Sequence, residues 1–190
     1  MNIEELIKDL PDSIYKDIEY AVSNYDFEEI FGDECKVITY SELSTYDSID
    51  DLLYEREGIL FIFILYEVKK NYGHWTLLIN HQSYIEFFDP YGYKPDEELK
   101  FTNPDYRKKY NMDFPYLTFL LYESELPIQY NDRQLQKFEK GVNTCGRWCI
   151  VRCQFFDINV DKFADYFVNL NKKDRLNGDK LVTYLTNYLL

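Results

Sequence analysis

The sequence predicts an α+β fold in which a mostly antiparallel central sheet packs against one buried helix, with further helices flanking it. Three observations predict this class. A β-branched and aromatic run covers 58–66, an alternating hairpin pattern follows at 73–88, and an apolar stripe with helical spacing starts at Cys145. Because the chain has 190 residues and no break in composition, we expect one domain, 1–190.

The N-terminal segment, residues 1–35, carries helical periodicity. Its apolar residues form one stripe before Pro11-Asp12-Ser13 and a second stripe after this helix-start signal, so we expect two short helices. A short strand is predicted at 35–40. Ser48 and Asp51 have the spacing of a capping box, which predicts another short helix after Ser48. None of these elements suggests chemistry.

The segment 58–92 is expected to supply the strands of the sheet. The run 58–66 is apolar on both faces, which makes it the candidate for the central strand. Residues on either side of His81-Gln82 form an antiparallel pair joined by a tight turn, and the second strand ends at Asp89. In that register His74 and Asp89 lie almost opposite one another at the open end of the hairpin, within side-chain reach.

The second half of the chain is expected to contain a polar excursion, a strand and several helices. The polar stretch 93–113 looks like a surface excursion, a helix is predicted at 116–123 and a strand at 126–130. The buried helix lies within 143–157. Two more helices are expected within 160–190, each after an Asn-containing start signal.

Composition restricts the partners of the protein. Lys plus Arg is 21 and Asp plus Glu is 34, so the formal charge is 21 − 34 = −13, which argues against a grip on nucleic acid or an anionic membrane. The longest apolar stretch, 59–66, is far shorter than the roughly twenty residues that span a bilayer. The acidic N-terminus does not resemble a signal peptide. We therefore expect an intracellular protein in a reducing compartment that does not enter a membrane.

Three of the four cysteines follow one another at intervals of four residues from Cys145. Cys145 sits in the first turn of its helix, where the positive end of the helix dipole and free backbone N–H groups favour the reactive thiolate. Cys149 and Cys153 are expected in the core. Three thiols along one straight helix cannot surround a tetrahedral ion, so we expect no metal and no other cofactor.

A cysteine on an apolar helix is commonly a core residue, so Cys145 needs partners before it suggests a function. A cysteine protease requires a thiolate, an imidazole that exchanges its proton, a group that orients the imidazole and donors for the oxyanion. Cys145, His74 and Asp89 supply the first three from a helix start and two strand ends, which are rigid positions. Their joint presence argues against a catalytically silent binding module.

Three motifs carry a family resemblance. Gly73-His74-Trp75, Phe88-Asp89-Pro90 and Asn143-Thr144-Cys145-Gly146 resemble the adenain-like and SUMO-deconjugating (Ulp-type) cysteine proteases, in their viral maturation branch. Gln136 upstream of the cysteine motif looks most like proteases of virophages and large DNA viruses. The resemblance covers 58–157 and implies a papain-like or adenain-like fold. It also implies that Cys145 is the nucleophile, His74 the general base and acid, and Asp89 its orienter.

The resemblance further implies a glutamine amide that forms the oxyanion hole with the Cys145 backbone N–H. In better-known members this glutamine lies six or seven residues before the cysteine, but those positions are Glu139 and Phe138 here. Gln136, nine residues before Cys145, is the candidate. Two other glutamines remain as alternatives, Gln134 and Gln129.

By this resemblance we expect a viral cysteine endopeptidase that cleaves capsid or core precursors after a small residue such as Gly. Trp75 and Gly146 are expected to bind the substrate polypeptide, and the enzyme to act in the host cytoplasm or virus factory and in the virion. An isopeptidase that removes ubiquitin-like modifiers is the alternative within the same fold, followed by an acyltransferase. Adenain is associated with DNA and a peptide cofactor, but the charge of −13 argues against a DNA role.

Overall fold

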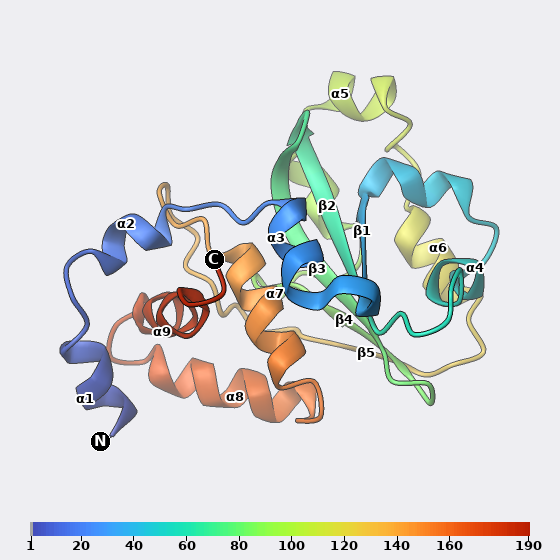
Figure 1. Cartoon of the computed structure of the whole chain (residues 1–190). Helices are drawn as coiled ribbons and strands as arrows, with labels where there is room; N and C mark the ends of the chain where they lie inside the picture. The colour runs from blue at the N-terminus through green and yellow to red at the C-terminus, as the bar shows by residue number, and fades with distance from the viewer. Residues whose placement is uncertain (1) are drawn as a thin grey trace.

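A five-stranded mixed sheet forms the centre of the computed structural model, which describes residues 2–190 (Figure 1). The strands lie in sequence order: β1 Cys35–Thr39, β2 Phe61–Lys69, β3 Tyr72–Asn80, β4 Ile85–Phe88 and β5 Ile128–Tyr130. The three middle strands are antiparallel, and each edge strand runs parallel to its neighbour. The predicted α+β class, with a sheet packed against a buried helix that starts at Cys145, is confirmed.

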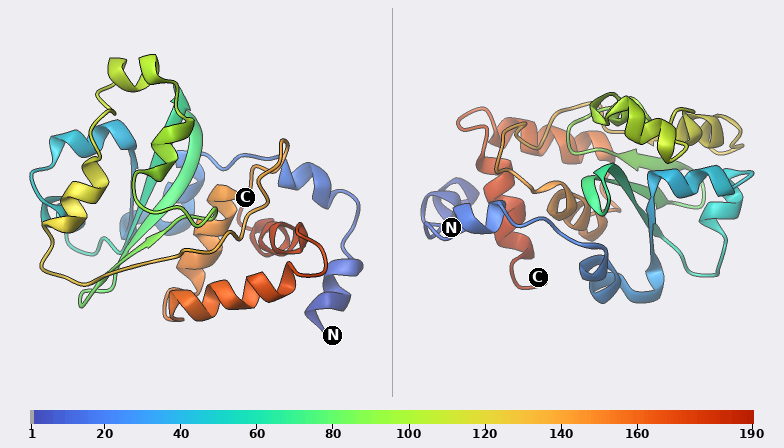
Figure 2. Two further views of the ribbon diagram at one scale, coloured as in Figure 1. Left: turned by 180° about the vertical axis from the view of Figure 1, so that it is seen from behind. Right: turned by 90° about the horizontal axis from the view of Figure 1, so that it is seen from above.

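Helices cover both faces of the sheet. Their bounds are α1 Ile3–Lys8, α2 Ile14–Ile18, α3 Asn24–Phe31, α4 Ile49–Leu53, α5 Pro104–Lys109, α6 Tyr116–Tyr122, α7 Cys145–Gln154, α8 Val160–Leu170 and α9 Asn177–Thr186. Short 3₁₀ helices are η1 Gly32–Glu34, η2 Tyr40–Thr45 and η3 Glu97–Phe101. Helices α1 and α2 contact α9, so the N-terminal and C-terminal helices pack together beside the sheet (Figure 2).

The N-terminal segment contains a third helix, α3, that the sequence interpretation missed. Its start is fixed by Ser23, whose backbone N–H donates to the Asp26 carboxylate at 2.7 Å in a reciprocal capping box. The Ser-x-x-Asp spacing was a readable signal. The helix matters because its Phe27 packs against Trp75, the residue that follows His74.

Strand β2 is buried on both faces, which explains why its sequence from Phe61 to Tyr66 is apolar throughout. Phe61, Phe63 and Leu65 belong to the core between the sheet and α7, whereas Ile62 and Ile64 belong to a second core on the opposite face. Side chains alternate between the faces of a strand, so a strand covered on both sides must be apolar at every position. The middle strand of the sheet is β3, however, and β2 lies beside it.

The β3–β4 hairpin differs from the predicted one in its register. Leu77 pairs with Phe88, which is a shift of two residues from a ladder that would place His74 opposite Asp89. The turn lies one residue further along the chain than predicted, at Gln82-Ser83, because the backbone N–H of His81 donates to the carbonyl of Tyr84 at 3.1 Å and pairs these two residues across the hairpin. Gln82 in this turn has a positive φ of 64°. The side chains of His74 and Asp89 therefore meet diagonally.

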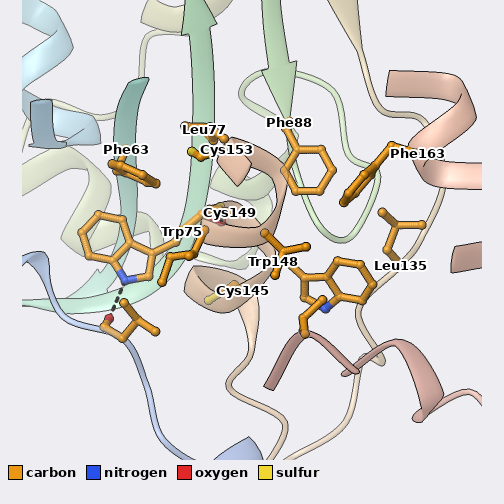
Figure 3. Packing of buried hydrophobic residues seen from close by; sticks show 14 of the residues in the cluster. Phe63, Trp75, Leu77, Phe88, Leu135, Cys145, Trp148, Cys149, Cys153 and Phe163 are labelled. Atoms are coloured by element: carbon orange, nitrogen blue, oxygen red, sulfur yellow. Dashed lines mark hydrogen bonds between the residues drawn. The ribbon is translucent and has the colours of Figure 1, made fainter. Parts of the chain in front are cut away.

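Helix α7 is buried, and its side chains pack among aromatic residues of the core (Figure 3). All of its residues from Cys145 to Cys153 are buried, including Arg152, whose guanidinium donates twice to the Glu86 carboxylate of β4 at 2.6 and 2.7 Å. This paired and hydrogen-bonded ion pair fixes the C-terminal half of α7 to the sheet. Across residues 2–190, no helix has the length and apolarity needed to cross a bilayer.

Candidate active site

The fold brings His74, Asp89 and Cys145 together from three separate elements. His74 lies on β3, Asp89 directly follows β4, and Cys145 is the first residue of α7. The His74 Nε2 atom lies 3.0 Å from Asp89 Oδ1. That contact leaves Nδ1 as the nitrogen that can exchange a proton with a thiol. His74 and Cys145 line the same cavity.

The surroundings of His74 favour its charged form. Burial disfavours the imidazolium, but the charge and hydrogen bond of Asp89, followed by the interaction with Cys145, raise the pKa of His74 well above its ordinary value. Tyr91 stacks on the imidazole with a centroid distance of 4.5 Å and an interplanar angle of 16°. The group can therefore hold a thiolate–imidazolium pair, the reactive form of a cysteine nucleophile.

Asp89 is held in place by its backbone surroundings. Its Oδ1 atom also accepts a hydrogen bond from the backbone N–H of Tyr91 at 2.7 Å, and its carbonyl accepts one from Asn131 Nδ2 at 2.8 Å. The side chain is fully buried. A carboxylate fixed in this way orients the imidazole without moving itself.

Gln136 is the predicted glutamine that reaches the cavity. Its side chain is buried, lines the cavity with Cys145, and donates from Nε2 to the Val142 carbonyl at 3.0 Å. Gln134 is exposed and donates to the Gln136 carbonyl, and Gln129 lies on β5 opposite Glu86. Of the three glutamines considered, the geometry therefore favours Gln136.

The predicted substrate residues Trp75 and Gly146 both pack on Val22. Trp75 lines the cavity, and its indole N–H donates to the Val22 carbonyl at 2.8 Å (Figure 3). A Cβ on Gly146 would lie 2.6 Å from the Val22 Cβ, so glycine is needed for close packing there. Gly146 is not among the residues that line the cavity with Trp75.

Asp179 of α9 was not anticipated from the sequence, although it holds the turn that precedes Cys145. Its buried carboxylate accepts hydrogen bonds from Thr144 Oγ1 at 2.5 Å, Trp148 Nε1 at 2.9 Å and the Lys137 backbone N–H at 3.0 Å. Burial, opposed by these hydrogen bonds, raises the pKa of Asp179 to about 6. One side chain thus links the residue before Cys145 to the residue after Gln136.

The cavity has a volume of about 630 Å³, within the range of ligand-binding clefts. It extends from Cys145 to α3, β1 and η2, and Glu28 of α3 and Glu42 of η2 line it. Within the described part of the chain, no lysine or arginine lines it. The charge of the cavity wall is therefore negative, which favours basic side chains in whatever binds there.

Glu98 is the other acidic group beside the imidazole. Its Oε1 atom lies 3.9 Å from His74 Nε2, and ligand atoms of His74, Asp89 and Glu98 all lie within 4.8 Å of one another. A cation coordinated by this group would occupy the lone pair of His74 Nε2 and so break the hydrogen bond between Nε2 and Asp89. We therefore describe the group by its hydrogen bonds and do not assign it as a metal site.

No protein-family model matches the chain. Among solved structures, the SUMO protease Ulp1 with its catalytic cysteine oxidized aligns with 95% of this chain and 79% of its own at 16% identity and a TM-score of 0.36. The C-terminal Ulp1 protease domain in complex with Smt3 aligns with 95% of this chain and 78% of its own, at 16% identity and a TM-score of 0.38. ChlaDub1 from Chlamydia trachomatis aligns with 94% of this chain and 88% of its own, at 14% identity and a TM-score of 0.39. TM-scores this low do not assign a function.

A relative in a virophage is much more similar in sequence. The uncharacterized protein V9 of Sputnik virophage is 35% identical over 167 residues, which cover 87% of this chain and 94% of the relative. This similarity agrees with the predicted likeness to virophage proteins. The chain belongs to the same protein family as V9 of Sputnik virophage.

Proposed function

We propose that the protein is a cysteine endopeptidase of viral origin. The observation that carries this proposal is that Cys145 and His74 line one cavity, with the imidazole hydrogen-bonded to the buried Asp89 carboxylate at 3.0 Å. These residue types in this arrangement meet the requirements of nucleophilic acyl transfer.

The reaction follows from the positions of these side chains. His74 takes the proton of the Cys145 thiol, and the thiolate attacks the carbonyl carbon of the scissile peptide bond. The imidazolium then donates its proton to the amine nitrogen as the C–N bond breaks, which leaves a thioester on Cys145. Neutral His74 next takes a proton from water, and the hydroxide formed attacks the thioester. Cys145 leaves as the thiolate, and the acid product departs.

Two donors are available for the oxyanion that forms in both steps. The backbone N–H of Cys145 belongs to the first turn of α7, where backbone N–H groups have no partner within the helix. The Gln136 amide has a second N–H besides the one given to Val142. Asp179 steadies both sides of this hole through Thr144 and Lys137.

We further propose that the substrates are capsid or core precursors, cleaved after a small residue such as Gly in infected cells and virions. The virophage relative supports a viral context. The buried position of Cys145, which is 9% exposed, supports a small residue at the scissile bond because a large side chain would be kept away from the sulfur.

The test is to incubate the purified protein with structural-protein precursors of its virus and, separately, with ubiquitin-like conjugates. We expect cleavage of the precursors at defined bonds, lost in a Cys145→Ala variant and retained in Cys35→Ala, which changes a buried cysteine of β1. Cleavage of the conjugates alone would replace the maturation role by an isopeptidase role. If Cys145→Ala cleaves as fast as the wild type, the nucleophile is assigned wrongly.

A further inference from the structure

We propose that Glu98 is a positioning residue of this site: acting through His74, it serves as a second carboxylate that stabilises the imidazolium. The inference rests on the proposed function, which requires a charged His74 beside the Cys145 thiolate. It assigns a task to a side chain that lies outside the three residues of the proposed mechanism.

The first support is the position of Glu98. Its side chain is buried, and its Oε1 atom lies 3.9 Å from the same His74 Nε2 atom that faces Asp89 Oδ1 at 3.0 Å. Two buried carboxylates thus face one ring nitrogen. An N–H at Nε2 that carries positive charge is attracted by both, whereas a neutral imidazole leaves two like charges close together.

The second support is a pair of unsatisfied oxygens. Among residues 2–190, neither Glu98 Oε1 nor Asp89 Oδ2 has a hydrogen-bond partner. A buried carboxylate oxygen without a partner is unfavourable unless a nearby positive charge compensates it. The imidazolium of His74 is the compensating group that the geometry provides for both carboxylates.

The third support is that the segment carrying Glu98 is fixed at both ends. Before η3, the Asp96 carboxylate accepts hydrogen bonds from the Tyr40 hydroxyl at 2.5 Å and the Thr118 backbone N–H at 2.7 Å. After η3, Thr102 Oγ1 donates to the Glu67 carbonyl of β2 at 3.2 Å. The expectation that 93–113 is only a surface excursion is therefore wrong for this part, since Glu98 is held against the site.

The charges around Glu98 place its ionisation near neutral pH. Burial, the largest effect, raises the pKa of Glu98, and the negative charges of Asp89 and Glu97 raise it further. The positive charges of His74 and Lys100 lower it. Together these effects give a pKa of about 7. Two phenols, Tyr91 and Tyr93, also face this carboxyl group and are neutral in this range. Above pH 7 the ionised Glu98 would thus keep His74 charged to higher pH.

The decisive experiment is a titration of His74 by NMR in the full chain carrying Cys145→Ala, with and without Glu98→Gln. The chain has only two histidines, so His81 serves as an internal reference. We expect Glu98→Gln to lower the pKa of His74 by about one unit or more, the usual effect of removing an opposite charge at such a distance. Glu97→Gln, which removes the same charge at an exposed position of the same 3₁₀ helix, should lower it much less.

Equal His74 titrations in the Glu98→Gln and Glu97→Gln variants would overturn the proposal. If Glu98→Gln does not fold, the Cys145→Ala variant alone still tests the proposal. Glu98 lies 3.9 Å from His74, so its ionisation near pH 7 must change the NMR signals of His74 and add a second inflection to their titration curve. A single-step titration curve would contradict the assignment.

Activity gives an independent readout. In the enzyme that retains Cys145, Glu98→Gln should move the alkaline limb of the pH profile of kcat/KM to lower pH by the same amount, with KM little changed. Failure of the wild type to cleave any polypeptide would remove the proposed function, while the NMR titration would still show whether Glu98 acts on His74. The two failures are therefore distinguishable.

Discussion

At the scale of one residue, the buried amide of Gln136 is the proposed oxyanion donor of the site. Its backbone N–H donates to the Pro90 carbonyl at 2.9 Å, beside Asp89, and its side chain donates to Val142, three residues before Cys145. The amide is therefore fixed between the two halves of the site. A donor fixed before the reaction stabilises the oxyanion without reorganising, which is why such donors have large effects.

We expect Gln136→Ala to lower kcat by roughly a hundredfold or more, with a small effect on KM, because the lost N–H acts only in the transition state. Gln134→Ala is the matched control, since Gln134 is exposed two residues away. Steady-state kinetics on a peptide substrate would measure both. Equal kcat values for the two variants would give the oxyanion role to another donor.

Some site residues could be predicted from the sequence and others could not, because only the first group lies in local sequence motifs. His74, Asp89 and Cys145 each lie in a short motif next to a strand or helix boundary, so the pattern of the chain marks them. Asp179 and Glu98 have no such motif, because their roles arise from contacts with segments 35 and 24 positions away in the chain, at Thr144 and His74. Only the folded chain brings those segments together.

At the scale of elements, the position of Cys145 depends on how α7 is fixed to the sheet. Arg152 is completely buried, pairs with the Glu86 carboxylate and also donates to the Phe155 and Ile158 carbonyls in the segment that follows the helix. These contacts satisfy the hydrogen-bonding needs of the buried charge. The pair therefore locks the helix against β4.

Arg152→Leu should destabilise the protein by about 3–5 kcal/mol, since it leaves the buried Glu86 carboxylate with only its 3.3 Å contact to His81. As a control, Arg133→Leu removes a half-exposed arginine that pairs with Asp161 and Asp165 on the surface, and should cost at most about 1 kcal/mol. Urea denaturation followed by circular dichroism measures both changes. Similar losses for the two variants would show that the buried pair does not fix α7.

The elements themselves were largely predictable, whereas their register was not. The capped helix after Ser48, the strand at 35–40 and the helix that starts at Cys145 follow from local patterns, and the structure contains α4, β1 and α7 there. The hairpin register depends on which two residues form the turn. The hydrogen bond from His81 to Tyr84 places the turn at Gln82-Ser83, and the sequence here has no turn signal as clear as an Asn-Gly pair.

At the scale of the whole molecule, the acidic charge extends into the candidate site. The chain has a formal charge of −13, and Glu28 and Glu42 line the cavity. A cleft with negative walls attracts basic segments and repels acidic ones, and dissolved salt weakens both effects.

We therefore expect kcat/KM for peptides with Lys or Arg near the scissile bond to fall several-fold as salt rises from about 0.05 to 0.5 M, whereas acidic peptides gain. Glu28→Gln should reduce the preference for basic peptides. Glu29→Gln, which changes an exposed neighbour that does not line the cavity, should leave it nearly unchanged. The same salt dependence for basic and acidic peptides would contradict this prediction.

The stability of the whole molecule should depend on pH in a direction set by its buried acids. Burial raises the pKa of Glu98 to about 7 and that of Asp179 to about 6, above their ordinary values of 4.5 and 3.8. Folded chains then hold protons that unfolded chains have lost, so the contribution of both groups is fully present below about pH 4 and is lost as pH rises through 6 and 7. Carboxylates with lowered pKa values, such as Glu86 beside Arg152, act in the opposite direction at lower pH.

These opposing contributions place the expected maximum of stability on the mildly acidic side of neutrality. The free energy of unfolding in urea should fall between pH 5 and 8 as Glu98 and Asp179 lose their protons in the folded state. In Glu98→Gln this fall should be smaller, by on the order of 2 kcal/mol, because the variant has no proton to lose at that position. The two proteins should therefore differ least at pH 5 and most at pH 8, with the variant the more stable. Parallel stability curves from pH 5 to 8 would mean that Glu98 ionises in the folded protein as easily as in the unfolded chain.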